Sequence, residues 1–222
     1  MKGQLLFFLF LPLFYLAQIK TDRPGEGTAS DVVSPKTIQL ESGVVYHKDE
    51  IGFTSDHLLR LGITEKWEVR LQTNQDLSDS SESTYGFSSK YKFLAGENFS
   101  PSLALIADSD FQFKDYSFTL ASDKKLTENL GSSAGIAYLK ENLLHYFFFS
   151  FGLDYTFEDD RWAIFGEYFG YYNSMLSPEH GSDFGLTFLA SPNLQLDVSF
   201  GSNLQNISNQ YFLSTGISYQ FR

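Results

Sequence analysis

The chain ends with HGSDFGLTFLASPNLQLDVSFGSNLQNISNQYFLSTGISYQFR, residues 180–222, in which apolar and polar side chains alternate. The apolar positions are Phe184, Leu186, Phe188, Leu194, Leu196, Val198, Phe200, Leu213, Ile217, Tyr219 and Phe221. A period of two is typical of β-strands that meet different surroundings on their two faces. In a soluble sandwich the apolar face would form the core. In a transmembrane barrel it would face lipid, and the polar face would line the interior.

The composition favours β-structure and excludes several classes of function. The 222 residues include 23 Phe and 13 Tyr, and a chain of this length is expected to form one domain. Because cysteine is absent, the chain has neither disulfides nor a thiolate metal site. A net charge of −11 leaves nothing to offset phosphate repulsion, so we expect no nucleic-acid partner.

The N-terminus predicts export. Lys2 precedes an apolar run from Leu5 to Leu16, which is too short to cross a bilayer as a helix and is typical of a signal peptide. We therefore expect residues 1–17 to be a signal peptide that is cleaved after Ala17. No later stretch approaches about 18 consecutive apolar residues, which argues against helical membrane anchors. Residues 18–37 are polar and contain prolines, so we expect a periplasmic N-terminal segment or a plug there.

From Ile38 onward the alternation continues to the end of the chain and predicts about twelve strands, an even number as in bacterial outer-membrane barrels. Short turns alternate with longer, more polar connections, among them residues 47–56 and 140–143, as expected for periplasmic turns and extracellular loops. Trp67 and Trp162 each follow a short turn, where barrel aromatics meet the membrane interface. The predicted strands are 38–46, 57–64, 67–75, 84–93, 101–108, 116–124, 130–139, 144–156, 161–172, 182–190, 194–202 and 211–221.

The fold prediction is therefore an all-β, antiparallel, up-and-down transmembrane β-barrel over residues 38–222. We expect it to be a monomer that contacts outer-membrane lipid. In this arrangement Tyr219 and Phe221 form the closing edge and pair with residues 40–46, because a barrel joins its last strand to its first.

Strand parity assigns a set of charged side chains to the barrel interior. The basic members lie mostly on early strands and the acidic members mostly on late strands, so closure of the barrel would let the two groups approach each other. One interpretation is a paired network that fills a narrow interior, since unpaired charges in a confined space are costly. The other is a permeation path or ligand site lined by opposite charges. The predicted lumen-lining residues are Glu41, Arg60, Glu68, Arg70, Lys90, Lys92, Glu167, Asp183 and Asp197, and we expect Asp22 and Arg23 at the periplasmic mouth.

Several short motifs resemble a known family of Gram-negative outer-membrane proteins, described as meta-pathway phenol-degradation proteins or as transporters. At the start of the mature chain these are Thr21-Asp22-Arg23-Pro24-Gly25, Pro35 and Ile38-Gln39-Leu40-Glu41-Ser42-Gly43. Toward the end they are Phe165-Gly166-Glu167-Tyr168, Asp183-Phe184-Gly185 and Ser191-Pro192-Asn193-Leu194-Gln195-Leu196-Asp197. The resemblance covers nearly all of the mature chain and implies an outer-membrane barrel with a transport role. The chain departs from such barrels by ending on Arg222 after the aromatic Phe221.

Enzymatic and metal chemistry find little support in the sequence. The four histidines show no metal-ligand spacing within one element, and the chain has neither a phosphate-binding loop nor a nucleophile elbow. His180 and Ser182 share a strand face in the manner of outer-membrane phospholipases, but the adjacent Asn173 and Asn203 fall on the other parity, so an orienting partner is missing. We therefore expect no enzyme and no cofactor.

The leading functional expectation is a passive transporter or channel for a small, aromatic or otherwise poorly polar solute. A closed structural or interaction barrel that acts through its extracellular loops is the alternative. A soluble, exported ligand-binding barrel is the third.

Overall fold

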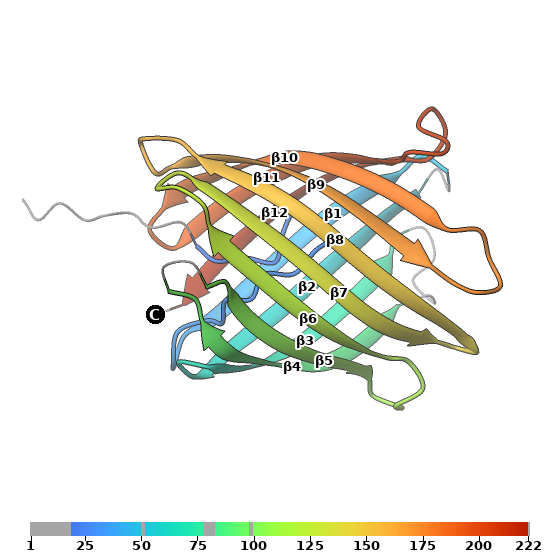
Figure 1. Cartoon of the computed structure of the whole chain (residues 1–222), viewed down its shortest axis with the longest axis horizontal. Coiled ribbons are helices and arrows are strands. Elements are labelled where there is room, and N and C mark those ends of the chain that lie inside the picture. The colour runs from blue at the N-terminus through green and yellow to red at the C-terminus, as the bar shows by residue number, and fades with distance from the viewer. Residues whose placement is uncertain (1–18, 50–51, 78–82, 98–99, 222) are drawn as a thin grey trace, which may run out of the picture.

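The computed structural model describes residues 19–49, 52–77, 83–97 and 100–221, and the predicted signal peptide lies outside these residues. The strands close into a single antiparallel barrel in which each strand pairs with its neighbours in sequence and β1 pairs with β12 (Figure 1). The strands are β1 Ile38–His47, β2 Gly52–Thr64, β3 Trp67–Asp76, β4 Thr84–Ala95, β5 Ser102–Asp110, β6 Tyr116–Lys125, β7 Leu130–Glu141, β8 Leu144–Thr156, β9 Trp162–Tyr172, β10 Glu179–Ser191, β11 Leu194–Asn203 and β12 Tyr211–Phe221.

The closing register agrees with the sequence prediction. Leu40 on β1 pairs with Tyr219 on β12, and Ile38 pairs with Phe221, so the end of the chain completes the ring. Among the described residues no helix has the length and apolar character needed to span a bilayer. The barrel prediction is confirmed, and the closure brings charged residues from opposite ends of the sequence into one interior.

Two of the predicted long connections are wrong. Residues 52–56 do not belong to a loop but extend β2 and pair with β1, from Gly52 opposite His47 to Asp56 opposite Gly43. At the tip of the β7–β8 hairpin, Glu141 pairs with Leu144, so only Asn142 and Leu143 remain as a turn. Polar residues at the ends of barrel strands stay in register because each ladder hydrogen bond satisfies backbone groups that would otherwise need another partner.

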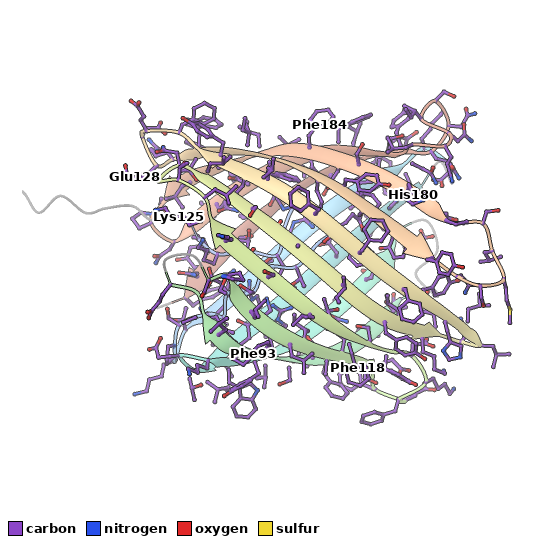
Figure 2. All side chains as sticks on the ribbon, viewed as in Figure 1. Phe93, Phe118, Lys125, Glu128, His180 and Phe184 are labelled. Atoms are coloured by element: carbon purple, nitrogen blue, oxygen red, sulfur yellow. The ribbon has the colours of Figure 1, made fainter. Side chains whose placement is uncertain are left out.

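The two faces of the sheet are inverted relative to a soluble protein. On β11, Gln195, Asp197 and Ser199 are buried, whereas Leu196 and Val198 are exposed on the outside. Figure 2 shows the same arrangement at Phe93, Phe118 and Phe184, which project outward from the ribbon. Trp67 and Trp162 are exposed at the starts of β3 and β9, on the rim of short turns. The Phe and Leu face of the C-terminal stretch is therefore the outer surface of the barrel, and the polar face is the inner surface.

Candidate functional site

The segment from Ile19 to Thr37 lies against the inner wall of the barrel, where Figure 1 draws it in blue within the ring of strands. Its backbone is held by side chains from opposite sides of the sheet. The Glu41 carboxylate on β1 accepts hydrogen bonds from the amides of Asp22 (3.0 Å) and Arg23 (3.2 Å). The Glu167 carboxylate on β9 accepts from the amides of Glu26 (3.0 Å) and Gly27 (3.1 Å). We call residues 19–37 the inner segment.

Asp22 is the centre of a charge cluster in this interior. Its carboxylate lies 2.7 Å from the Arg70 guanidinium, 3.2 Å from Lys90 Nζ and 3.7 Å from the Arg60 guanidinium. Burial alone would raise the pKa of Asp22, but Arg70, Lys90 and Arg60 outweigh burial and hold the pKa well below its usual range. The aspartate is therefore charged at any physiological pH and ties β2, β3 and β4 to the inner segment.

A second layer of buried ion pairs supports this cluster. Arg60 donates to Glu41 (2.8 Å) and to both oxygens of Glu68 (3.0 and 3.1 Å), and Arg70 donates to Glu68 (2.6 Å). Arg60, Glu41, Glu68 and Lys90 have no solvent-exposed surface. The same groups bind the inner segment, since Arg60 also donates to the backbone carbonyls of Lys20 and Asp31, at 3.0 Å each.

Arg23 links the inner segment to the strands near the closure of the barrel, β2, β11 and β12. Its guanidinium forms ion pairs with Asp56 on β2 and with Asp197 on β11 (3.3 Å), and it donates to Ser214 Oγ on β12 (2.8 Å). Gly43 and Gly216 face each other across the β1–β12 seam, and a Cβ on either would collide with this guanidinium. The expected position of Asp22 and Arg23 at the periplasmic mouth is therefore wrong, because both contact residues midway along the strands.

The expected approach of early basic strands to late acidic strands is also not found among the described residues. The inner segment supplies partners to both groups instead, with Asp22 for Arg60, Arg70 and Lys90, and Arg23 for Asp197. Lys92 pairs with Asp31 of the inner segment at 2.8 Å. Glu167 and Asp183 are buried on β9 and β10 and form no ion pair within the described parts of the chain. The sequence could not assign these partners, because the inner segment has no strand periodicity from which its position follows.

Cavities lie on both sides of the inner segment. A cavity of 390 Å³ reaches the rim of short turns, where it is lined by Lys125 and Glu128, both visible at that end of the barrel in Figure 2. A second cavity of 280 Å³ lies against Arg70, Asp108 and Phe148. The residues that line both are Asp22, Gly25, Gly27 and Thr28, so this part of the inner segment is the wall between them.

A third cavity of 200 Å³ lies toward the opposite rim, among Glu26, Phe169, Tyr171 and Phe212. It shares Glu26 and Tyr171 with the 280 Å³ cavity, so the two meet at these side chains. Enclosure by the barrel and then the neighbouring Glu167 carboxylate raise the pKa of Glu26, although solvent still reaches this side chain and screens part of the effect.

His180, the histidine considered for phospholipase chemistry, contacts a tyrosine instead of an orienting asparagine. His180 Nδ1 lies 2.9 Å from the Tyr168 hydroxyl, and the two rings stack at 5.9 Å between centroids. Within the described parts of the chain, no group of three or more His, Cys, Asp or Glu side chains has the geometry to hold a metal ion.

A family model described as "Putative MetA-pathway of phenol degradation" matches residues 21–221. Solved structures share the fold. The KdgM porin aligns with a TM-score of 0.66 at 14% identity, covering 83% of this chain and 99% of that chain. The KdgM porin in complex with disordered oligogalacturonate gives a TM-score of 0.62 at 15% identity, covering 84% and 99%. An outer-membrane channel from Pseudomonas putida F1 gives 0.59 at 11% identity, covering 89% and 99%. No curated protein matches the sequence.

Proposed function

The chain belongs to the family described as "Putative MetA-pathway of phenol degradation", and from this membership we propose that it is a passive channel in the outer membrane of a Gram-negative bacterium. The solute is small and poorly polar. The predicted interior residues hold the inner segment and orient the solute, and none of them acts as a chemical catalyst. The similar fold of the KdgM porin and of the Pseudomonas putida outer-membrane channel supports this proposal.

The observation that carries the proposal is the pair of cavities on the two sides of residues 22–28. The 390 Å³ cavity on the side of the short turns and the 280 Å³ cavity on the other side are separated by one stretch of polypeptide without regular structure. Unlike a strand of the barrel, this stretch is held by side-chain contacts and not by a continuous ladder. Its displacement would join the two cavities into one path.

The walls of the 280 Å³ cavity support a poorly polar solute. Leu58, Ile106, Leu139 and Phe148 supply an apolar surface, and polar groups converge from the inner segment and from Arg70. Small-molecule sites commonly combine a mainly apolar wall with a few placed polar groups. A small aromatic compound with one polar substituent fits this combination.

A second candidate function has an observation of its own. Asp22 and Arg23 form ion pairs with β2, β3, β4 and β11. If these ion pairs never break, the inner segment stays in place and the interior stays closed to solutes. In that case the barrel is structural or acts through its loops. Solute flux separates the two functions.

Liposomes that contain the purified barrel are expected to swell in isotonic solutions of small uncharged solutes, and swelling is expected to decrease as solute size increases. The measurement is light scattering after dilution, and liposomes reconstituted with an unrelated closed barrel of about eight strands, which has a side-chain-filled interior, are the control. Swelling no faster than in these control liposomes would refute the channel and favour the closed barrel.

Placement of the outer face in lipid gives a further prediction. Phe184 lies near the middle of β10, is 60% exposed and projects outward (Figure 2). We expect Phe184→Arg to lower the free energy of unfolding in lipid vesicles by about 2–4 kcal/mol, because arginine near the bilayer midplane is costly. Phe53→Arg, at the end of β2, is the matched control and should cost about 0–1 kcal/mol. Equal costs at the two positions, measured by urea unfolding, would contradict this placement.

A further inference from the structure

Two buried carboxylates in the barrel have no counter-ion among the residues that the structure describes. Glu167 on β9 and Asp183 on β10 are cross-strand partners, and their side chains are only 8% and 2% exposed. Both oxygens of Asp183 and Oε1 of Glu167 have no hydrogen-bond partner among the described residues. Like charges directly opposite each other destabilise a sheet, and burial increases that cost. A positive ligand would relieve both effects.

A third carboxylate connects this pair to the cavities. The amides of Glu26 and Gly27 donate to Glu167, which fixes Glu26 beside the pair. The Glu26 side chain itself lines both the 200 Å³ and the 280 Å³ cavity, and the Tyr171 hydroxyl lies 3.5 Å from its Oε2. Glu26 thus presents a carboxylate to the 200 Å³ and 280 Å³ cavities, next to Glu167, which itself lines the 390 Å³ cavity, and Asp183 lies opposite Glu167 on the neighbouring strand.

Aromatic rings surround the same place. Phe169, Tyr171 and Phe212 line the 200 Å³ cavity, and the Phe148 ring packs against Tyr171 in a tilted arrangement, with 4.9 Å between ring centroids. Phe212 crosses Gly201, the β11 partner of Asp183, where a Cβ would collide with its ring. The rings are therefore neighbours of the acidic pair. Aromatic faces attract cations, and they do so most strongly for organic ammonium groups in poorly hydrated surroundings.

The basic side chains of the interior do not neutralise this region. Arg60, Arg70 and Lys90 pair with Asp22, and Arg23 pairs with Asp56 and Asp197. Glu26, Glu167 and Asp183 form no ion pair with any residue that the structure describes. A chelated metal ion is not favoured either, because no three carboxylates among the described residues have that geometry. The missing positive charge is better supplied by a weakly hydrated ligand.

We infer that the interior contains a site for a small organic cation, an amine or quaternary ammonium that carries an apolar group. Its charge lies beside Glu26, with Glu167 and Asp183 behind, and among the rings of Phe169, Tyr171 and Phe212. Its apolar group extends into the 280 Å³ cavity. This inference rests on the proposed function for the entry of a solute, and it narrows the solute to cations. Oligogalacturonate, present in the KdgM porin complex, is an anion and would be repelled here.

Titration calorimetry with benzyltrimethylammonium tests the site on the full chain in dodecyl maltoside, a detergent without ammonium groups. We expect saturable binding at one site, about tenfold weaker binding of benzyl alcohol, and no binding of benzoate. Asp183→Asn is expected to weaken benzyltrimethylammonium about tenfold, because one nearby charge in this setting contributes on the order of one such factor. Phe212→Leu should weaken it several-fold.

Asp154→Asn is the matched control. It removes one carboxylate from the 390 Å³ cavity on the other side of the inner segment and should leave the affinity unchanged. If Asp183→Asn does not fold, Glu26→Gln tests the same charge from a side chain that solvent reaches. The inference would be overturned if benzyltrimethylammonium and benzyl alcohol bound with equal affinity. It would also be overturned if Asp154→Asn weakened benzyltrimethylammonium binding as much as Asp183→Asn.

Binding in detergent does not depend on passage through the barrel. A chain that binds the cation in micelles but gives no swelling in liposomes would refute the proposed channel and leave the cation site intact. A chain that gives swelling with uncharged solutes but binds no cation would refute the cation site and leave the proposed channel intact.

Discussion

Replacing Asp22 and Arg23 together by alanine is expected to raise the conductance of the barrel several-fold in planar lipid bilayers. These side chains hold residues 22–28 between the two large cavities through ion pairs to β2, β3, β4 and β11. With both removed, residues 22–28 keep mainly their backbone contacts to Glu41 and Glu167. The constriction between the cavities should then open for much of the time.

Two controls make this result specific. Lys20→Ala removes a side chain of the same segment that is 69% exposed and should leave conductance unchanged. Mild acidification should not reproduce the double substitution. The pKa of Asp22 is lower in the folded chain than in the unfolded chain, so its stabilising contribution is present above the unfolded value and is lost only as the pH falls through the depressed folded value.

A disulfide provides the opposite manipulation. A Cβ on Gly27 would lie 2.7 Å from Ser150 Oγ, so Gly27→Cys with Ser150→Cys places two sulfurs within bonding reach, and the chain has no native cysteine to interfere. We expect low conductance when this variant is oxidised and recovery after reduction. Unchanged conductance in both the oxidised barrel and the alanine variant would show that residues 22–28 do not control the path.

Arg60→Met is expected to destabilise the folded barrel by about 3–5 kcal/mol, the typical cost when one partner of a buried ion pair is removed. Arg60 is fully buried and neutralises Glu41 and Glu68, and methionine would leave both carboxylates without this partner. It would also remove the donors to the Lys20 and Asp31 carbonyls of the inner segment. The measurement is urea unfolding in lipid vesicles. Unfolding is monitored as the fraction of the protein that keeps its folded mobility in electrophoresis.

The double variant Glu41→Gln, Arg60→Met separates lost charge balance from lost packing. Because it removes one charge of each sign and leaves Glu68 paired with Arg70, it should recover most of the stability that Arg60→Met loses. Lys66→Ala, at the exposed β2–β3 turn, should change stability little. A double variant as unstable as Arg60→Met would show that packing or the carbonyl contacts, and not charge balance, account for the loss.

The strands and their faces could be predicted because β-structure carries a local signal. Each apolar residue on the outer face of β10 and β11 is two positions from the next, so parity alone placed Asp183 and Asp197 opposite Phe184 and Leu196. Strand ends were less accurate. The polar residues 52–56 resemble a loop in sequence, and only their pairing with β1 extends β2 to Gly52.

Strand parity selected charged residues for the candidate site but could not assign their partners. Glu41, Arg60, Glu68, Arg70 and Lys90 were selected by parity, and the structure gathers them around Asp22, which parity could not select because it lies outside the strands. The sequence did contain one indication of this role. Asp22 and Arg23 are adjacent residues of opposite charge in the segment that precedes the first strand. Their solute-orienting role and that of the other interior residues stay predictions.

Local patterning is enough to predict a barrel with an apolar outer face and a charged inner face, because a period of two assigns both faces from neighbouring residues. Which of the interior charges meet depends on the three-dimensional fold. Closure of the barrel brings together Asp56, Asp197 and Ser214, which are far apart in the sequence. Arg23 of the inner segment lies between them and contacts all three. Long-range distances of this kind depend on the register and curvature of the whole sheet, which no local pattern contains. The polar face of residues 180–222 thus supplies Asp197, the partner of Arg23, and also Asp183, whose carboxylate has no partner among the described residues.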